Sequence, residues 1–137
     1  MRLALTDKII KKYMDEQGIT DFLDCSNESD GLAMAGGYWL ATGKRADVFF
    51  SADGLCNALN FLTSWIIPEG IEMNLFISTG RQESPHKVMS DIYDDLIKLI
   101  PFDAKRISII GDGWTVDVIA HIFKQLNEVT TGNSSQQ

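Results

Sequence analysis

Four short polar segments hold the residues of this chain that could do chemistry, namely 27–28, 52–57, 79–86 and 111–114. The carboxyl group of Glu28 is suited to proton transfer. The planar guanidinium of Arg81 suits a carboxylate, phosphonate or sulfonate, and His86 could donate a proton or bind an anion beside it. Ordinary structural roles stay open for all three: a first-turn helix glutamate, a solvated loop arginine and a helix-capping histidine.

The apolar pattern of the sequence predicts the elements that position these segments. Short apolar runs bounded by polar residues predict strands, and apolar residues at helical spacing predict helices. Thr6 is expected to cap the first helix. We expect strands over 20–25, 46–51, 73–78 and 106–110, and helices over 7–17, 27–43, 55–67, 88–100 and 114–126.

This alternation of strands and helices indicates the fold class. Right-handed crossovers between consecutive strands give an α/β fold, here a three-layer, doubly wound and mostly parallel sheet. Ligands of such folds bind beyond the carboxyl ends of the strands. Each of the four polar segments follows a predicted strand, so we expect them to share one edge of the sheet.

Composition restricts the classes of function. The 137 residues carry 12 Lys and Arg against 19 Asp and Glu, a formal net charge of -7, which opposes binding to nucleic acid or to an anionic membrane. The longest apolar stretch, 59–67, is far shorter than the ~20 residues that a membrane span needs. No signal peptide or paired-cysteine pattern is recognised. We therefore expect a reduced, cytoplasmic protein with a single domain over 1–128 and a flexible tail over 129–137.

Two segments together resemble a known family. Residues 26–44 (SNESDGLAMAGGYWLATGK) resemble a stretch of thiamine-diphosphate enzymes, closest to the pyrimidine-binding domain of phosphonopyruvate and sulfopyruvate decarboxylases. Residues 51–60 (SADGLCNALN) resemble the serine-glycine-leucine-glycine-asparagine turn that follows there, and 77–86 (ISTGRQESPH) are similar, in a shorter loop, to the family's arginine-glycine-glutamate and histidine. The resemblance covers 6–100 and implies the thiamine-diphosphate-binding fold of the pyrimidine-domain type.

The resemblance also implies roles for individual residues. Glu28 would be the catalytic carboxyl, holding the aminopyrimidine of thiamine diphosphate as its imino tautomer. Gly54 and Asn57 would let the turn after Ser51 approach the ring of the cofactor, because glycine tolerates a positive φ and leaves room for a ligand. Cys56 stands where the family has a second glycine; we expect a buried thiol there, and no catalytic role for Cys56 or Cys25. The implied cofactor-binding residues are Glu28, Asp53, Gly54, Leu55 and Asn57, and the implied substrate-binding residues are Arg81 and His86.

A complete enzyme of this family also needs a diphosphate and magnesium site. The glycine-aspartate-glycine at 111–113 lacks the closing asparagine of the family's magnesium motif, so it is interpreted as a plain turn into the last helix. We expect no metal ligand on this chain, and a β subunit that supplies the Mg²⁺ ligands and the diphosphate-binding domain in a hetero-oligomer.

The implied function is the pyrimidine-binding alpha subunit of a two-subunit thiamine-diphosphate-dependent decarboxylase, a lyase acting on a small 2-oxoacid, or of a related carboligase. Only residues 1–5 precede the first predicted helix, so the sheet is expected to be one strand short. That departure and Cys56 keep open an alternative function, a non-catalytic homologue that acts as an assembly or regulatory partner.

The small residues Ala33, Gly36 and Gly37 predict a helix face that is bare enough for close packing. We expect this face to contact the β subunit or a second copy of the chain. Packing within the chain is the alternative.

Overall fold

The computed structural model describes residues 1–80, 87–100, 104–111 and 114–119, and the expected tail 129–137 lies outside them. Its centre is a six-stranded sheet with the strand order β2-β1-β3-β4-β6-β5. Strands β1 to β4 pair in parallel, whereas β6 is antiparallel to both β4 and β5. The strands are β1 (Arg2–Ala4), β2 (Leu23–Asp24), β3 (Asp47–Ser51), β4 (Asn74–Thr79), β5 (Ala104–Gly111) and β6 (Trp114–Ile119).

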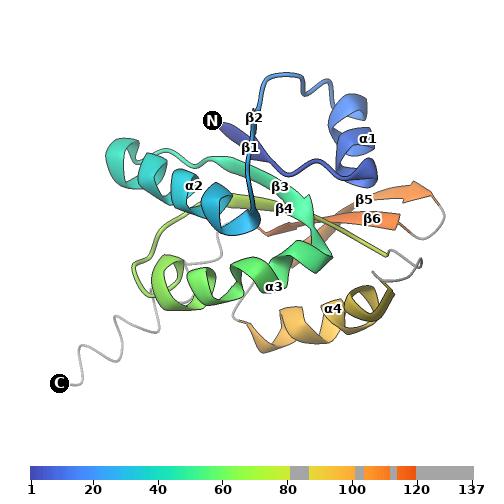
Figure 1. Cartoon of the computed structure of the whole chain (residues 1–137). Helices are drawn as coiled ribbons and strands as arrows, with labels where there is room; N and C mark the ends of the chain where they lie inside the picture. Colours follow the sequence, from blue (N-terminus) through green and yellow to red (C-terminus); the bar gives the residue numbers. More distant parts are fainter. Residues whose placement is uncertain (81–86, 101–103, 112–113, 120–137) are drawn as a thin grey trace.

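Helices cover both faces of the sheet (Figure 1). One face carries α1 (Lys8–Glu16), whose Ile10 and Met14 pack on Phe49. The other face carries α2 (Glu28–Thr42), α3 (Ala52–Phe61) and α4 (Lys87–Leu99), with a π-helical turn η1 (Leu62–Ile66) after α3. The α/β class with a mostly parallel sheet between helices is therefore confirmed.

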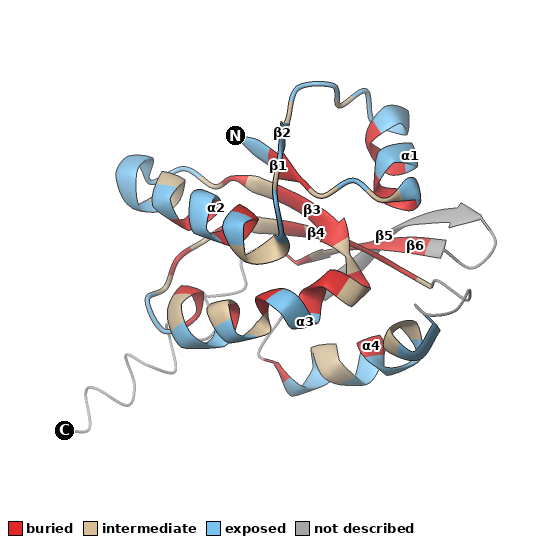
Figure 2. Ribbon diagram, viewed as in Figure 1, coloured by how far each residue is buried: buried red, intermediate tan, exposed pale blue. Residues whose placement is uncertain are grey.

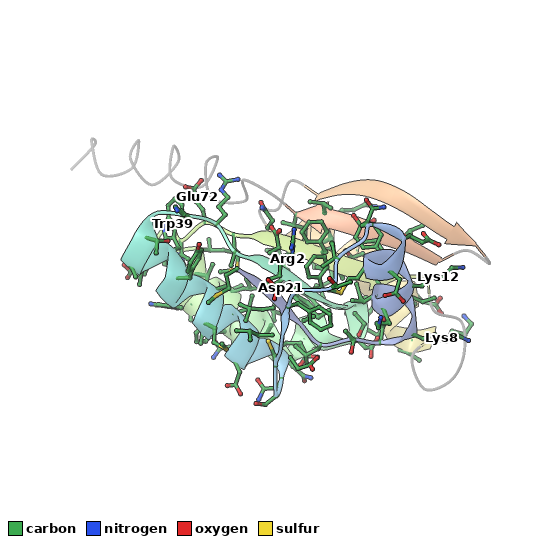
Figure 3. The ribbon with its side chains drawn as sticks, turned by 90° about the horizontal axis from the view of Figure 1, so that it is seen from above. Arg2, Lys8, Lys12, Asp21, Trp39 and Glu72 are labelled. Atoms are coloured by element: carbon green, nitrogen blue, oxygen red, sulfur yellow. The ribbon has the colours of Figure 1, made fainter. Side chains whose placement is uncertain are left out.

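The two apolar clusters follow from the alternation of side chains along the strands. In β3, Phe49 faces α1, and Val48 and Phe50 face the larger cluster under α2 and α3. Strands β3 and β4 and the inner sides of the helices are mostly buried, and the outer sides of the helices are exposed (Figure 2). Lys8 and Lys12 project from the exposed side of α1 (Figure 3).

Local signals explain where the helices begin and end. Asp7, not Thr6 as expected, caps α1: its Oδ1 atom accepts a hydrogen bond from the Ile10 amide at 2.7 Å. Asn27 caps α2 in the same way, and Gly43 ends that helix in the left-handed conformation at φ 69°. Helix α3 begins at Ala52, three residues before the expected start, because no turn separates it from β3.

The N-terminal segment corrects one prediction. Arg2–Ala4 forms a parallel strand between β2 and β3, and Leu3 and Ala4 are fully buried. The sheet is therefore not short of its first strand. Leu3 and Ala4 are each paired on both sides, and Arg2 pairs with Asp47 of β3.

The C-terminal part of the fold also differs from the prediction. Instead of a parallel strand followed by a helix, β5 and β6 form an antiparallel pair in which Gly111 lies opposite Trp114. Successive side chains of the segment WTVDVI point to opposite faces of the sheet, as those of the buried Thr115 and Val116 do. Its β-branched residues favour a strand. The part of the expected helix beyond Ile119 lies outside the described residues.

Candidate functional site

A cavity of about 440 Å³ lies at the carboxyl ends of β1, β2 and β3. This is the topological switch point of the sheet, because the two strands that follow β1 in the sequence, β2 and β3, lie on opposite sides of it. Ligand sites in open α/β sheets form at such a switch point. The cavity is lined by Ala4, Leu5, Thr6, Asp7, Asp24, Cys25, Glu28 and Ser51.

Glu28 is the first residue of α2 and its side chain is half-buried at the rim of this cavity. Its Oε2 atom accepts a hydrogen bond from Asn57 Nδ2 at 3.2 Å. The next residue, Ser29, donates from its hydroxyl to the Asn57 carbonyl at 2.9 Å. These two bonds join the first turn of α2 to the second turn of α3 and fix the glutamate carboxyl beside α3.

Gly54 is required by this placement. A Cβ atom at position 54 would lie 2.7 Å from both Cγ and Cδ of Glu28, a separation too short for any side chain. Gly54 lies within α3, and its φ is not among the positive values. The expected turn after Ser51 is therefore the start of α3, and the missing side chain at Gly54 makes room for Glu28.

The other residues of the second segment have separate surroundings. Leu55 is fully buried in the core under α2 and α3. Asp53 is half-buried in the first turn of α3. Cys56 is exposed, contrary to the expected buried thiol, and its sulfur lies 3.7 Å from the sulfur of Met89 on α4. Within an α-helix position 56 has no need of a glycine, so the cysteine does not distort the backbone.

Two further carboxylates line the cavity and were not predicted. Asp24 ends β2, and Asp7 follows β1. Oδ2 of Asp7 accepts a hydrogen bond from Ser78 Oγ at 3.0 Å, which ties the start of α1 to the end of β4. With Glu28 they make the lining acidic, and none of the described lining residues is basic. Such a lining suits a ligand with positive charge or with hydrogen-bond donors.

The described residues contain no cluster of three or more His, Cys, Asp or Glu side chains that could hold a metal ion. Arg81 and His86, the two expected substrate-binding residues, lie outside the described residues, as do Asp112 and Gly113. Of the residues expected to bind cofactor or substrate, the structure therefore brings together Glu28, Gly54 and Asn57.

Cys25 lines the cavity and packs against the hydrophobic core. Its sulfur would lie 3.2 Å from a Cβ atom at position 31, which explains the glycine there. Burial, followed by the charges of Asp24 and Asp30, raises the pKa of the Cys25 thiol, against a lowering by its backbone hydrogen bond to Ala4. A raised pKa leaves less thiolate, which is the nucleophilic form.

We expect Cys56 to be alkylated well before Cys25 in the folded protein. The difference in rate arises because Cys56 is exposed, whereas Cys25 is half-buried and burial raises the pKa of its thiol. Timed iodoacetamide labelling followed by peptide mass spectrometry measures both alkylation rates. Raising the pH above the usual pKa of a thiol should reduce the difference between the two rates. Labelling in denaturant, where both thiols are open, is the control. Equal rates in the folded state would contradict the structural role of Cys25.

No known protein family matches the sequence, and no curated protein is significantly similar to it. None of the helices in the described ranges is long and apolar enough to cross a membrane.

Proposed function

We propose that this chain is the pyrimidine-binding alpha subunit of a two-subunit thiamine-diphosphate-dependent enzyme. The reaction is decarboxylation of a small 2-oxoacid, of the phosphonopyruvate and sulfopyruvate type, or a related carboligation. One observation carries the proposal: the Glu28 carboxyl lies at the rim of the switch-point cavity, packed on Gly54 and held by Asn57. The sequence resemblance independently selects these three residues.

The geometry suits the chemistry that a pyrimidine site needs. Thiamine diphosphate, when bound, supplies the carbanion stabilisation that decarboxylation requires. Glu28 would hold a proton at the ring nitrogen of the aminopyrimidine, which favours the imino tautomer. Asn57 fixes one carboxylate oxygen, so the orientation of the carboxyl is set before the ligand arrives.

The charge of the cavity also supports this cofactor. The thiazolium ring is cationic, and the amino group of the pyrimidine donates hydrogen bonds. The acidic lining would attract the cationic ring and accept hydrogen bonds from the amino group; its carboxylates are Asp7, Asp24 and Glu28. A diphosphate group, in contrast, has no basic partner among the described lining residues. Its binding and that of Mg²⁺ would therefore depend on a β subunit.

A non-catalytic homologue that acts as an assembly or regulatory partner is the second candidate. The antiparallel β5–β6 pair favours it, because β6 pairs with β4 and β5 where the alternation of strands and helices predicts a parallel strand over 106–110. The resemblance ends at residue 100, before this pair begins. Reaction rates of Glu28 variants separate the two candidates.

The isolated chain should bind thiamine diphosphate weakly and without dependence on Mg²⁺, because the diphosphate half of the site is on the partner. Isothermal titration calorimetry with the cofactor, with and without magnesium, measures this. Tight binding that requires magnesium would show that the chain is not half of a split site. Titration with thiamine, which lacks the diphosphate, is the control and should give a similar weak affinity.

A further inference from the structure

The outer side of α4 carries a stripe of exposed apolar side chains, shown as exposed in Figure 2. Val88, Ile92 and Leu99, named the α4 stripe, are 70%, 48% and 83% exposed. All three belong to the helix itself, at separations of four and seven residues, so they share one side of it. Tyr93 and Leu96 pack on the core instead. Single exposed apolar residues are common, whereas a continuous stripe indicates a surface that packs on another element.

The sequence that follows β6 has a matching pattern. Apolar residues recur at intervals of three and four residues, which predicts a helix with one apolar side; they are Ile119, Ile122, Phe123 and Leu126. Lys124 falls on the opposite side of such a helix. Residues 120–128 lie outside those that the structure describes, and the pattern is read from the sequence.

The pairing of β6 fixes where this segment begins. Ile119, the last residue of β6, lies between Leu75 of β4 and Ala104 of β5. Ile100, directly after α4, belongs to the same buried cluster as Ile119. The four residues from Ile100 to Ala104 span at most ~14 Å. The segment therefore leaves the sheet at the end of α4 where Leu99 lies.

We propose that residues 120–128 form a helix that runs back along α4, antiparallel to it, with its apolar side on the α4 stripe. At the helical rise per residue, a helix of nine residues is about 14 Å long, and the stripe from Leu99 to Val88 is about 16 Å long. The segment therefore reaches from Leu99 past Ile92. Short connections between neighbouring helices give this antiparallel arrangement in helical proteins generally.

The tether at Ile119 favours this segment over a separate partner. A linked segment meets its docking surface at an effective concentration of roughly millimolar, which a second copy of the chain or another protein reaches only in concentrated solution. Docking also removes the side chains of Phe123 and Leu126 from water together with the α4 stripe, which is the main favourable term in packing.

This proposal is independent of the proposed function. None of the described residues that line the cavity belongs to α4, so the cavity stays open when the segment docks. The helix on the α4 stripe would instead complete the covering of the sheet on the side of β4 and β6.

Disulfide cross-linking, in a chain that lacks its native cysteines, tests the contact. Ile92→Cys is combined in turn with Phe123→Cys and with Leu126→Cys, on the apolar side of the segment, and with Lys124→Cys as the matched control. In dilute protein with oxidised glutathione, at least one apolar-side pair should close within single chains about tenfold faster than the control, because a disulfide needs Cα atoms ~4.4–6.8 Å apart. Peptide mass spectrometry identifies the linked residues, and circular dichroism verifies that each variant is folded.

Paired substitutions test whether the contact stabilises the fold. Ile92→Glu and Leu126→Glu should each raise the equilibrium constant for unfolding in urea by about tenfold, because each puts a charge into an apolar contact. The double variant should be no less stable than the less stable single variant, since docking is lost only once. Leu40→Glu, on α2 at 64% exposure, is the matched control and should leave the constant unchanged.

Three results would each overturn the proposal. They are equal closing rates for the apolar-side and control cysteine pairs, disulfides that form only between chains, and Ile92→Glu and Leu126→Glu variants that are as stable as Leu40→Glu or whose losses add in the double variant.

Discussion

Replacing Glu28 by glutamine should slow the proton exchange at C2 of thiamine diphosphate by ~10² to 10⁴ in the complex with the β subunit, equivalent to roughly 3 to 5 kcal/mol. Glutamine has nearly the same volume and can still hydrogen-bond with Asn57, but it cannot hold the transferred proton. The folding free energy should hardly change, because the Glu28 side chain is half-exposed. C2-proton exchange and oxoacid turnover, measured on matched assemblies, report the effect.

Two further variants make this result specific. Asp30→Asn removes the other acidic residue in the first turn of α2, so it controls for a loss of helix-dipole stabilisation and should leave the rate unchanged. Gly54→Ala keeps the glutamate but forces its carboxyl away from α3, and should slow exchange as well. If Glu28→Gln stays within about threefold of wild type, Glu28 is a helix-end charge and the non-catalytic function is favoured.

Gly36→Leu should destabilise the fold by about 3 kcal/mol, because a Cβ atom at this position would lie 2.6 Å from the Trp65 ring and overpacking of this kind is costly. The sequence pattern alone predicts that Gly36 lies at a contact with another subunit. The position of Trp65 instead assigns Gly36 to packing between α2 and η1. Urea unfolding followed by tryptophan fluorescence measures the free energy of unfolding.

Gly37→Leu is the matched control, since it places the same side chain one residue away in open space. It should leave the stability unchanged or raise it by up to about 1 kcal/mol, because leucine is the better helix former. Equal losses for both variants would show that η1 does not pack on Gly36 in solution.

Much of the central fold is predictable because its signals are local. Asn27 and Gly43 mark the ends of α2, and the apolar runs around Phe49 and Leu75 identify β3 and β4. The strand at 114–119 was missed because Val118 and Ile119 also fit a helical period with the apolar residues that follow them. Its pairing with β4 is a long-range contact that no local window contains.

The candidate site was predictable where it depends on a helix start. Glu28 begins α2, and its neighbours Gly54 and Asn57 belong to the first turns of α3, which the strand order places beside it. Asp24 escaped prediction because it lies inside the expected strand over 20–25, whereas the candidate segments all follow strands. Asp7 escaped prediction because β1, the strand before it, has only three residues. Such short strands carry almost no periodic signal.

The measurement that tests the central claim most directly is a titration of the isotopically labelled chain with thiamine diphosphate, observed by amide chemical shifts in nuclear magnetic resonance. The claim predicts weak, saturable shifts, with dissociation in the millimolar range, centred on Glu28, Ser29, Gly54 and Asn57, and lost in Glu28→Gln. No shift at these amides up to saturating cofactor, or shifts confined to another surface, would contradict a pyrimidine site at this corner of the sheet.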